Sequence, residues 1–239
     1  MPIQENHVAS GSANPAGLAG QLGFALADAM LSWLIAATLV SACAAAQEST
    51  DPGPCPGRPA AADWRAAASE ADRERLRDVR DAWDEALGQS RAAGHDAEIA
   101  GQGALFDPDA ALRGPLPPPG DYLCRTVKLG SPAAGGGLPY VEYPRFRCRI
   151  RADGDTLSLV KLTGSQRPIG RIYADTERRG IFLGTLQLGD ERRAYRYGED
   201  SERDLVAAVE RVGERRWRLV FPYPHFESLL DVIELTPAD

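Results

Sequence analysis

The chain has 239 residues, of which 44% are hydrophobic and 26% charged, a composition typical of a folded globular protein. Its formal net charge of −7 at pH 7 argues against a nucleic acid as a partner, because nucleic-acid-binding proteins carry strongly basic surfaces. The basic residues are almost all arginine, and lysine is nearly absent, as in proteins from GC-rich genomes.

An apolar run at residues 31–40 stops at the cysteine of Val40-Ser41-Ala42-Cys43. A short apolar run followed by small residues is typical of an export signal, and the four-residue pattern resembles the lipobox of bacterial lipoproteins. We therefore expect Cys43 to be lipidated and to tether the chain to a membrane. Ordinary cleavage at Ala44-Ala45-Ala46 and an uncleaved signal anchor remain open, although a spanning helix needs about 20 apolar residues.

The pattern divides the chain into residues 1–46 (a polar head with the export signal), 47–62 (a flexible linker), 63–114 (a helical segment) and 115–239 (an antiparallel β domain). Ala44, not aspartate, follows the cysteine, and resemblance to known bacterial lipoproteins then implies a periplasmic protein anchored in the outer membrane. A secreted, soluble periplasmic protein is the alternative. No basic residue precedes Arg58, so the positive start of a signal peptide is missing, and a translation start at Met30 stays open.

Residues 63–94 show helical periodicity, with apolar side chains on one face and charged side chains on the other. The apolar positions are Trp64, Leu76, Val79, Trp83 and Leu87. Asp63 or Ser69 can cap the start of the helix, and Gly94 can end it. Residues 96–112 are interrupted by glycine and proline and predict one or two short helices.

From residue 121 the periodicity changes to two. In residues 145–151 every second residue is arginine, so Phe146, Cys148 and Ile150 are predicted to face a core while the arginines face solvent. Strand-like runs between turn signals cover residues 122–128, 145–151, 156–162, 169–174, 180–188, 192–197, 205–212, 215–222 and 228–235. We expect an α+β, mainly β fold: a helical segment packed on an antiparallel barrel or sandwich of eight or nine strands, with a small up-and-down barrel favoured.

The four cysteines are Cys43, Cys55, Cys124 and Cys148. Cys124 and Cys148 are the expected disulfide pair, because both lie in strand-like segments of one domain. Cys55 lies in the linker, and it could pair with Cys43 if Cys43 is not lipidated. The cysteine spacing does not fit a zinc site, and we expect neither a metal nor a cofactor.

Two polar motifs are candidate ligand sites. Ser165, Gln166 and Arg167 could form a loop that donates hydrogen bonds and binds an anion, or they could be a simple hairpin turn. Arg216, Trp217 and Arg218 could stack on and bind an anionic ligand. Alternatively, the tryptophan packs in the core and the arginines pair with acidic residues.

His225, Glu227 and Ser228 lie close together in the sequence and suggest a catalytic triad, but the nucleophile-elbow pattern G-x-S-x-G is absent. Acidic residues at positions 153, 155, 175 and 177 do not have the spacing of an EF-hand loop and are expected in turns.

Several short motifs resemble, in order, those of the DUF4893 proteins of alphaproteobacteria, a family without an assigned function. They are PPGDYLCRTVKLG (118–130), FRCRI (146–150), KLTGSQRPIG (161–170), IFLGTL (181–186), ERVG (210–213), RWRL (216–219) and DVIEL (231–235). The resemblance implies one family domain over residues 63–237. Gly120-Asp121-Tyr122 with Arg216-Trp217-Arg218 is also similar to the calycin pattern, which implies a lipocalin-like barrel with the aromatic residue under a late-strand arginine.

These observations favour a cell-envelope protein that acts as a binding or interaction module without catalysis. Its expected partners are a membrane, through the lipid or signal anchor, and an envelope protein or a small ligand. A lipocalin-like carrier and a protease-inhibitor-like barrel are alternatives of the same class. A cryptic envelope hydrolase that uses the region of His225 is the alternative from another class.

Overall fold

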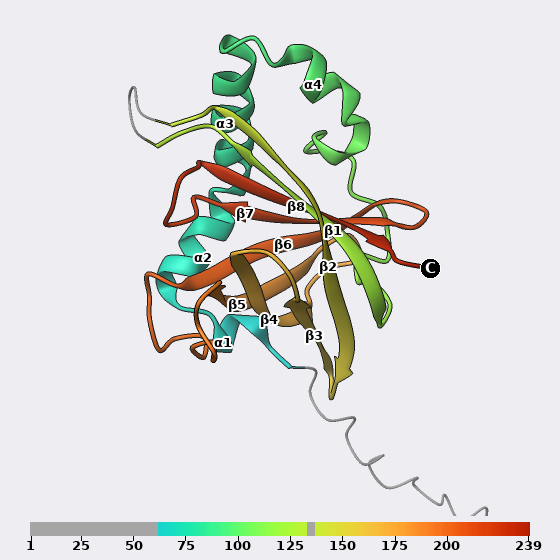
Figure 1. Ribbon diagram of the computed structural model, residues 1–239. Coiled ribbons are helices and arrows are strands. Elements are labelled where there is room, and N and C mark those ends of the chain that lie inside the picture. Colours follow the sequence, from blue (N-terminus) through green and yellow to red (C-terminus); the bar gives the residue numbers. More distant parts are fainter. Residues whose placement is uncertain (1–61, 133–136) are drawn as a thin grey trace, which may run out of the picture. The chain divides into compact units, whose positions relative to one another are not determined.

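The computed structural model describes residues 62–132 and 137–239. The predictions for Cys43, for Cys55 and for the segments before residue 62 lie outside the described residues. Eight antiparallel strands form a closed barrel in sequence order (Figure 1). The strands are β1 (Gly120–Leu129), β2 (Tyr140–Asp153), β3 (Thr156–Lys161), β4 (Gln166–Ala174), β5 (Gly180–Leu188), β6 (Asp204–Gly213), β7 (Arg216–Pro222) and β8 (Leu230–Pro237).

Pairing of β1 with both β2 and β8 closes the sheet. Because side chains alternate between the two faces of a strand, the inward residues of β1 are Tyr122, Cys124, Thr126 and Lys128, all of which are buried. The predicted pattern of β2 is confirmed, since Cys148 and Ile150 are buried in the barrel core. The expected mainly β barrel with a helical segment is therefore the observed fold.

One end of the barrel interior is filled by its own apolar side chains. Tyr122 and Trp217 meet edge to face there, with ring centroids 6.1 Å apart, and the Tyr122 hydroxyl donates to the carbonyl of Pro118. The calycin-like pattern implied that the aromatic residue lies under a late-strand arginine. In the structure the ring of Tyr122 instead packs against Trp217. Gly170 on β4 and Gly184 on β5 are paired opposite each other. They leave room for the ring of Phe182, because a Cβ atom at either glycine would lie 2.8 Å or less from that ring.

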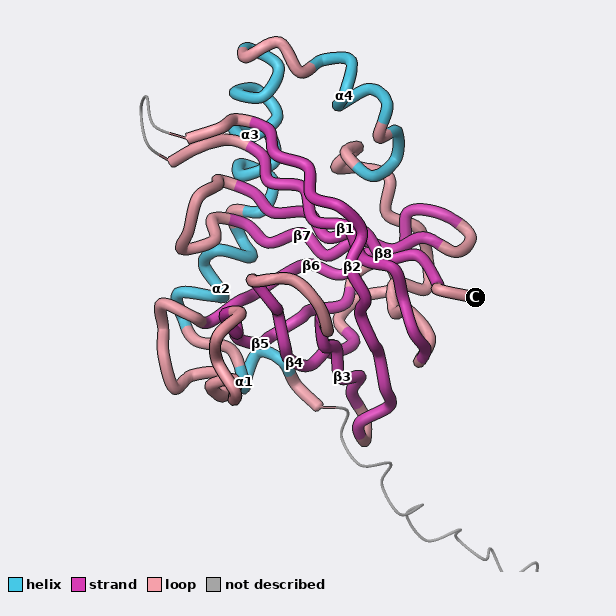
Figure 2. Tube along the Cα trace, in the orientation of Figure 1, coloured by secondary structure: helices cyan, strands magenta, loops and turns pink. Residues whose placement is uncertain are grey.

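The helical segment packs on the outside of the barrel (Figures 1 and 2). It consists of α1 (Trp64–Ala67), α2 (Glu70–Arg77), α3 (Val79–Ala92), α4 (Asp96–Gly101) and the 3₁₀ helix η1 (Gly103–Leu105). The α3 helix covers outward residues of β1, β6, β7 and β8, and α1 and α2 cover those of β4, β5 and β6. No helix of the described residues has the length and apolar character needed to cross a membrane.

The predicted helix caps are confirmed. Asp63 accepts a hydrogen bond from the backbone N–H of Arg65, and Ser69 accepts one from that of Asp72. Each residue caps its own helix, because the helical conformation is interrupted between α1 and α2. The predicted long helix is thus three successive helices, and α3 ends just before Gly94, whose φ of 94° suits glycine.

The strand predicted at residues 192–197 is wrong. These residues belong to the loop between β5 and β6, which pair directly with each other and leave no edge for a ninth strand. Tyr197 in this loop reaches α2, where its hydroxyl accepts from the backbone N–H of Ser69 and donates to Asp72. Tyr197 is thus held by a helix, whereas Tyr195 of the same segment is 46% exposed.

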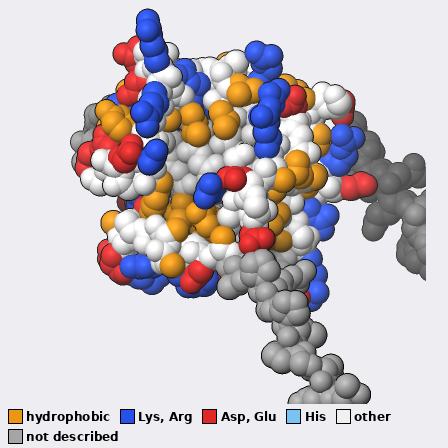
Figure 3. Space-filling view, turned by 90° about the horizontal axis from the view of Figure 1, so that it is seen from below, with side chains coloured by type: hydrophobic (Ala, Val, Ile, Leu, Met, Phe, Trp, Pro, Cys, Tyr) orange, Lys and Arg blue, Asp and Glu red, His pale blue; other side chains and the backbone are white. Residues whose placement is uncertain are grey.

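Charged side chains on the outside of the barrel are mixed in sign. Figure 3 shows basic and acidic side chains interspersed with apolar areas on the face seen from below. Some of these charges form exposed ion pairs between strands: Arg149 pairs with Asp121 at 2.5 Å, and Arg171 pairs with Asp153 at 2.9 Å. Such exposed pairs contribute little to stability, about 0–1 kcal/mol each.

The predicted disulfide between Cys124 and Cys148 is confirmed. It links β1 to β2 on their inward faces and closes a loop of 24 residues. Because a cross-link restricts the unfolded chain, it stabilises the hairpin on which closure of the barrel depends.

Replacing both cysteines (Cys124→Ala with Cys148→Ala) is expected to lower the free energy of unfolding by about 2–4 kcal/mol. Urea denaturation followed by circular dichroism measures this, with and without a reductant. The reductant should shift the curve of the wild-type protein and leave that of the double variant in place. A change below about 1 kcal/mol in the double variant would contradict a stabilising role.

Candidate functional site

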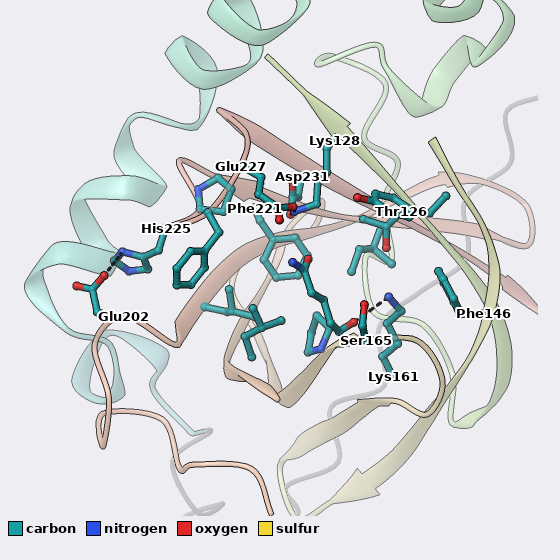
Figure 4. A pocket seen from close by; sticks show the side chains of 18 residues that line it. Thr126, Lys128, Phe146, Lys161, Ser165, Glu202, Phe221, His225, Glu227 and Asp231 are labelled. Atoms are coloured by element: carbon teal, nitrogen blue, oxygen red, sulfur yellow. Dashed lines mark hydrogen bonds and ion pairs between the residues drawn. The ribbon is translucent and has the colours of Figure 1, made fainter. Parts of the chain in front are cut away.

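A cavity of about 190 Å³ opens at the end of the barrel opposite the Tyr122–Trp217 contact (Figure 4). The loops β3–β4, β5–β6 and β7–β8 contribute to its lining, because an up-and-down barrel brings alternate loops to the same end. Residues from all eight strands and from the loops line it: Thr126, Lys128, Tyr143, Phe146, Lys161, Ser165, Gln166, Pro168, Leu186, Glu202, Leu205, Phe221, Pro224, His225, Phe226, Glu227, Asp231 and Ile233.

The wall of the cavity is largely apolar. Leu186, Leu205, Phe221 and Ile233 belong to the barrel core and extend up to the cavity. A Phe182–Phe221 edge-to-face contact, with centroids 5.8 Å apart, fixes the ring of Phe221. The apolar floor therefore favours a ligand with an apolar body.

Lys161, the last residue of β3, is only 5% exposed. Its Nζ donates to the carbonyl of Gln166 at 2.9 Å and lies 4.1 Å from the centroid of the Phe146 ring. Among the described residues, no carboxylate lies within ion-pair distance of it. Burial lowers the pKa of Lys161 to about 8; the charge of Lys128 adds to this effect, Asp231 opposes it, and Arg167 adds a smaller contribution.

Lys128 on β1 is in a different environment, although it lines the same cavity. Its Nζ pairs with Glu227 at 3.0 Å and with Asp231 at 3.4 Å (Figure 4). Burial alone lowers the pKa of Lys128, but the charges of Asp231 and Glu227 outweigh it and raise the pKa above its ordinary value. This lysine therefore keeps its positive charge at neutral pH.

Asp231 and Glu227 are held in place by the β7–β8 loop and the start of β8. Asp231 accepts a hydrogen bond from the hydroxyl of Ser228, and burial raises the pKa of Asp231 against the opposing effect of Lys128. Glu227 has a φ of 72°, a left-handed conformation that is uncommon for a residue other than glycine. In this conformation the Glu227 carboxylate pairs with Lys128.

Thr126 carries a buried polar atom without a partner. Its Oγ1 has no hydrogen bond among the described residues, and Thr126 lies where the pairing of β1 with β2 is irregular. Pro144, which has no backbone N–H, lies opposite this irregularity. A buried hydroxyl without a partner is costly, and the residue that carries it is one of those that line the cavity.

The suggested triad does not assemble. The His225 imidazole lies 3.8 Å from Glu202 at the rim of the cavity, whereas the Ser228 hydroxyl donates to Asp231 and Glu227 pairs with Lys128. His225, Ser228 and Glu227 therefore have three separate sets of partners. No group of three or more His, Cys, Asp or Glu side chains in the described residues could hold a metal ion.

The predicted ligand loop lies partly at this cavity. Ser165 and Gln166 line it, but the guanidinium of Arg167 donates to the carbonyls of Gly164 at 3.1 Å and Leu188 at 2.8 Å. Arg167 thus joins the β3–β4 and β5–β6 loops, and these hydrogen-bond donors are used within the protein. Its role as an anion ligand stays a prediction without support in this geometry.

The second predicted motif lies elsewhere. Trp217 is in the barrel core, whereas Arg216 and Arg218 face outward toward the helical segment. Arg216 pairs with Glu234 at 2.5 Å. Arg218 is fully buried, pairs with Glu210 at 2.7 Å, and lies 5.0 Å from the centroid of a Trp83 ring.

Arg218 is the main polar contact between the barrel and the segment that follows α4. Its guanidinium donates to the carbonyls of Ala104 at 3.1 Å, Leu105 at 2.9 Å and Asp107 at 2.8 Å. An arginine can satisfy several acceptors in this way because its five N–H donors form a planar fork. The arrangement is structural, and it leaves Arg218 no access to the cavity.

The sequence reasoning missed the residues that are most distinctive in the cavity: Thr126, Lys128, Lys161 and Asp231. Their positions in predicted strands made them look ordinary. A usable signal was present, because lysine occurs at only two positions in the chain. Each is in phase with inward residues of its strand, Lys128 with Cys124 and Lys161 with Leu159.

Comparison with protein-family models gives a match over residues 64–235 to the model described as "Domain of unknown function (DUF4893)". No curated protein and no solved structure matches the chain.

The structural role of the buried contacts of Arg218 can be tested by measuring stability. The substitution Arg218→Met is expected to lower the free energy of unfolding by about 3–5 kcal/mol, because it leaves a largely buried Glu210 and several carbonyls without a partner. Arg215→Met is the matched control, since Arg215 forms an exposed pair with Asp239 and should change stability by about 0.5 kcal/mol or less. Equal effects of the two substitutions in chemical denaturation would contradict the assigned role of Arg218.

Proposed function

This chain belongs to the DUF4893 family, and we propose that it is a binding module whose barrel mouth takes a small ligand with an apolar body and a hydrogen-bond-accepting head. The family carries no assigned function, so the proposal rests on the cavity. Binding by the mouth of a small barrel agrees with where ligand sites occur in this architecture.

The observation that carries the proposal is the meeting of an apolar wall with two polar groups that have unused donors. Lys161 has three N–H donors and makes one hydrogen bond within the described residues. The hydroxyl of Thr126 makes none there. Binding sites commonly combine a mostly apolar lining with a few polar groups that orient the ligand.

The size of the cavity restricts the ligand. At about 190 Å³, it is below the range of about 300–1,000 Å³ that is common for drug-sized ligands. The interior below it is filled by side chains such as Phe182 and Leu219. These facts support a ligand of a few carbon atoms rather than a lipid carried as in a lipocalin.

We further propose that the module works in the cell envelope, tethered through Cys43. This part of the proposal rests on the apolar run and lipobox-like pattern of the sequence. Ligand binding in the cavity does not depend on a membrane tether. It is therefore equally compatible with a soluble periplasmic form of the protein and with a protein partner bound elsewhere on the surface.

Butyrate is a suitable probe, because it joins a three-carbon apolar body to an anionic head. At pH 7 we expect butyrate to bind in calorimetric titration and butylammonium to bind at least about tenfold more weakly, since its head would face the charge of Lys161. Lys161→Met and Thr126→Val should each weaken butyrate binding by about tenfold, which corresponds to the loss of one hydrogen bond, charge-assisted for Lys161.

Arg149→Met is the matched control, because Arg149 is a basic residue on the outside of β2, and it should leave butyrate binding unchanged. Affinity should also fall as the pH rises through about 8, where Lys161 loses its charge. Equal binding of butyrate and butylammonium, or butyrate binding that survives Lys161→Met at full strength, would overturn the proposed site.

A further inference from the structure

The two lysines of this chain are distributed in an unusual way. The sequence contains Lys128 and Lys161 only, and the other 25 basic residues are arginines. Both lysines line the one cavity at the barrel mouth. A lysine can lose its proton near neutral pH when it is buried, whereas an arginine cannot, so this cavity holds both side chains of the chain that are of the type able to become a nucleophilic amine.

We propose that Lys161 captures small aldehydes or ketones in this cavity by forming a reversible imine. The inference rests on the proposed function, and it deepens it by naming carbonyl compounds as the ligand class.

The geometry separates the two amines. Lys128 is held by Glu227 at 3.0 Å and by Asp231 at 3.4 Å, and both contacts require its protonated form. Among the described residues, the Nζ of Lys161 contacts the carbonyl of Gln166 and the face of the Phe146 ring, without a carboxylate in ion-pair range. A neutral amine can keep the hydrogen bond to the carbonyl, so Lys161 loses little when it releases a proton.

Charged groups on the neighbouring elements act on Lys161 from several directions. Lys128 on β1 and Arg167 on β4 are positive, whereas Asp231 on β8 is negative and is itself engaged by Lys128. Glu227 also pairs with Lys128, and the His225–Glu202 pair lies at the rim. Tyr143 of β2 completes the titratable residues of the lining.

This environment agrees with an amine that is partly neutral near physiological pH. With a pKa of about 8, about one quarter of Lys161 is neutral at pH 7.5, compared with about one in a thousand for a lysine at the ordinary value. Desolvation and a neighbouring cation are known means of activating a lysine nucleophile.

The reaction balances without an oxidant or reductant. The Nζ lone pair attacks the carbonyl carbon, a C–N bond forms, and the C=O π bond becomes an oxygen anion that accepts a proton to give a carbinolamine. The nitrogen releases one proton to solvent at this stage. The hydroxyl then takes up a proton, the C–O bond breaks, and water leaves as the nitrogen lone pair forms the protonated imine, which can release its proton to give C=N. Thr126 lines the same cavity, and its hydroxyl, which is buried and has no partner among the described residues, is the proposed donor for the carbonyl oxygen.

The test uses the full chain, butanal as the probe and cyanoborohydride, which reduces the imine to a stable secondary amine. Peptide mapping by mass spectrometry then gives the initial rates of modification of Lys161, Lys128 and the terminal amine separately. We expect Lys161 to react at least about tenfold faster than Lys128, and its rate to rise with pH through about 8.

Arg151→Lys supplies a matched control, because it places a lysine on the exposed outer face of β2. Lys161 should react at least about tenfold faster than this introduced lysine at pH 7.5, and excess butyrate should slow Lys161 alone. If Lys161 reacts no faster than the introduced lysine, the imine proposal is overturned, while calorimetric binding of butyrate would still support the binding site. If butyrate also fails to bind, both proposals fall.

Discussion

Closure of the sheet through β1 is the constraint on which the rest of this molecule depends. Because β1 pairs with β2 on one side and β8 on the other, the inward side chains of eight strands share one small interior. Apolar residues fill that interior at one end, and the disulfide fixes β1 to β2 within it. Polar residues on inward positions near the other end are therefore brought together around one cavity.

The two lysines show how this constraint produces different chemistry from identical side chains. Lys128 faces two carboxylates from the β7–β8 region, and it stays charged. Lys161 extends into the cavity from β3, and its neighbours are the carbonyl of Gln166 and the ring of Phe146. Environments that push the pKa values of two titratable groups apart are a recurring feature of functional sites, and here both groups line one cavity.

Local patterns predicted much of this fold. The alternation in residues 145–151 placed Cys148 inward, and the position of Cys124 and Cys148 in strand-like segments of one domain led to the disulfide. The capping residues Asp63 and Ser69 were also recognisable, because capping is a local interaction. The loop at residues 192–197 was mistaken for a strand, because the contact of Tyr197 with α2 joins residues that are distant in sequence and leaves no local signal.

The candidate site was harder to predict, because it is built from long-range register. Lys128, Lys161 and Asp231 come from three strands, and only the closed barrel brings them to one mouth. Arg218 illustrates the converse. Its motif suggested a ligand site, but the arginine is used to hold residues 104–107 against the barrel, a contact that depends on how the helical segment packs.

The most direct measurement is an NMR titration of the protein with isotope-labelled lysine, in which the side-chain signals of two residues are followed against pH and assigned with Lys161→Arg. We expect one lysine to titrate at about pH 8 and the other above its ordinary value of 10.5. Two lysines that both titrate near 10.5 would contradict the account, because the cavity would then hold no amine able to act in its neutral form.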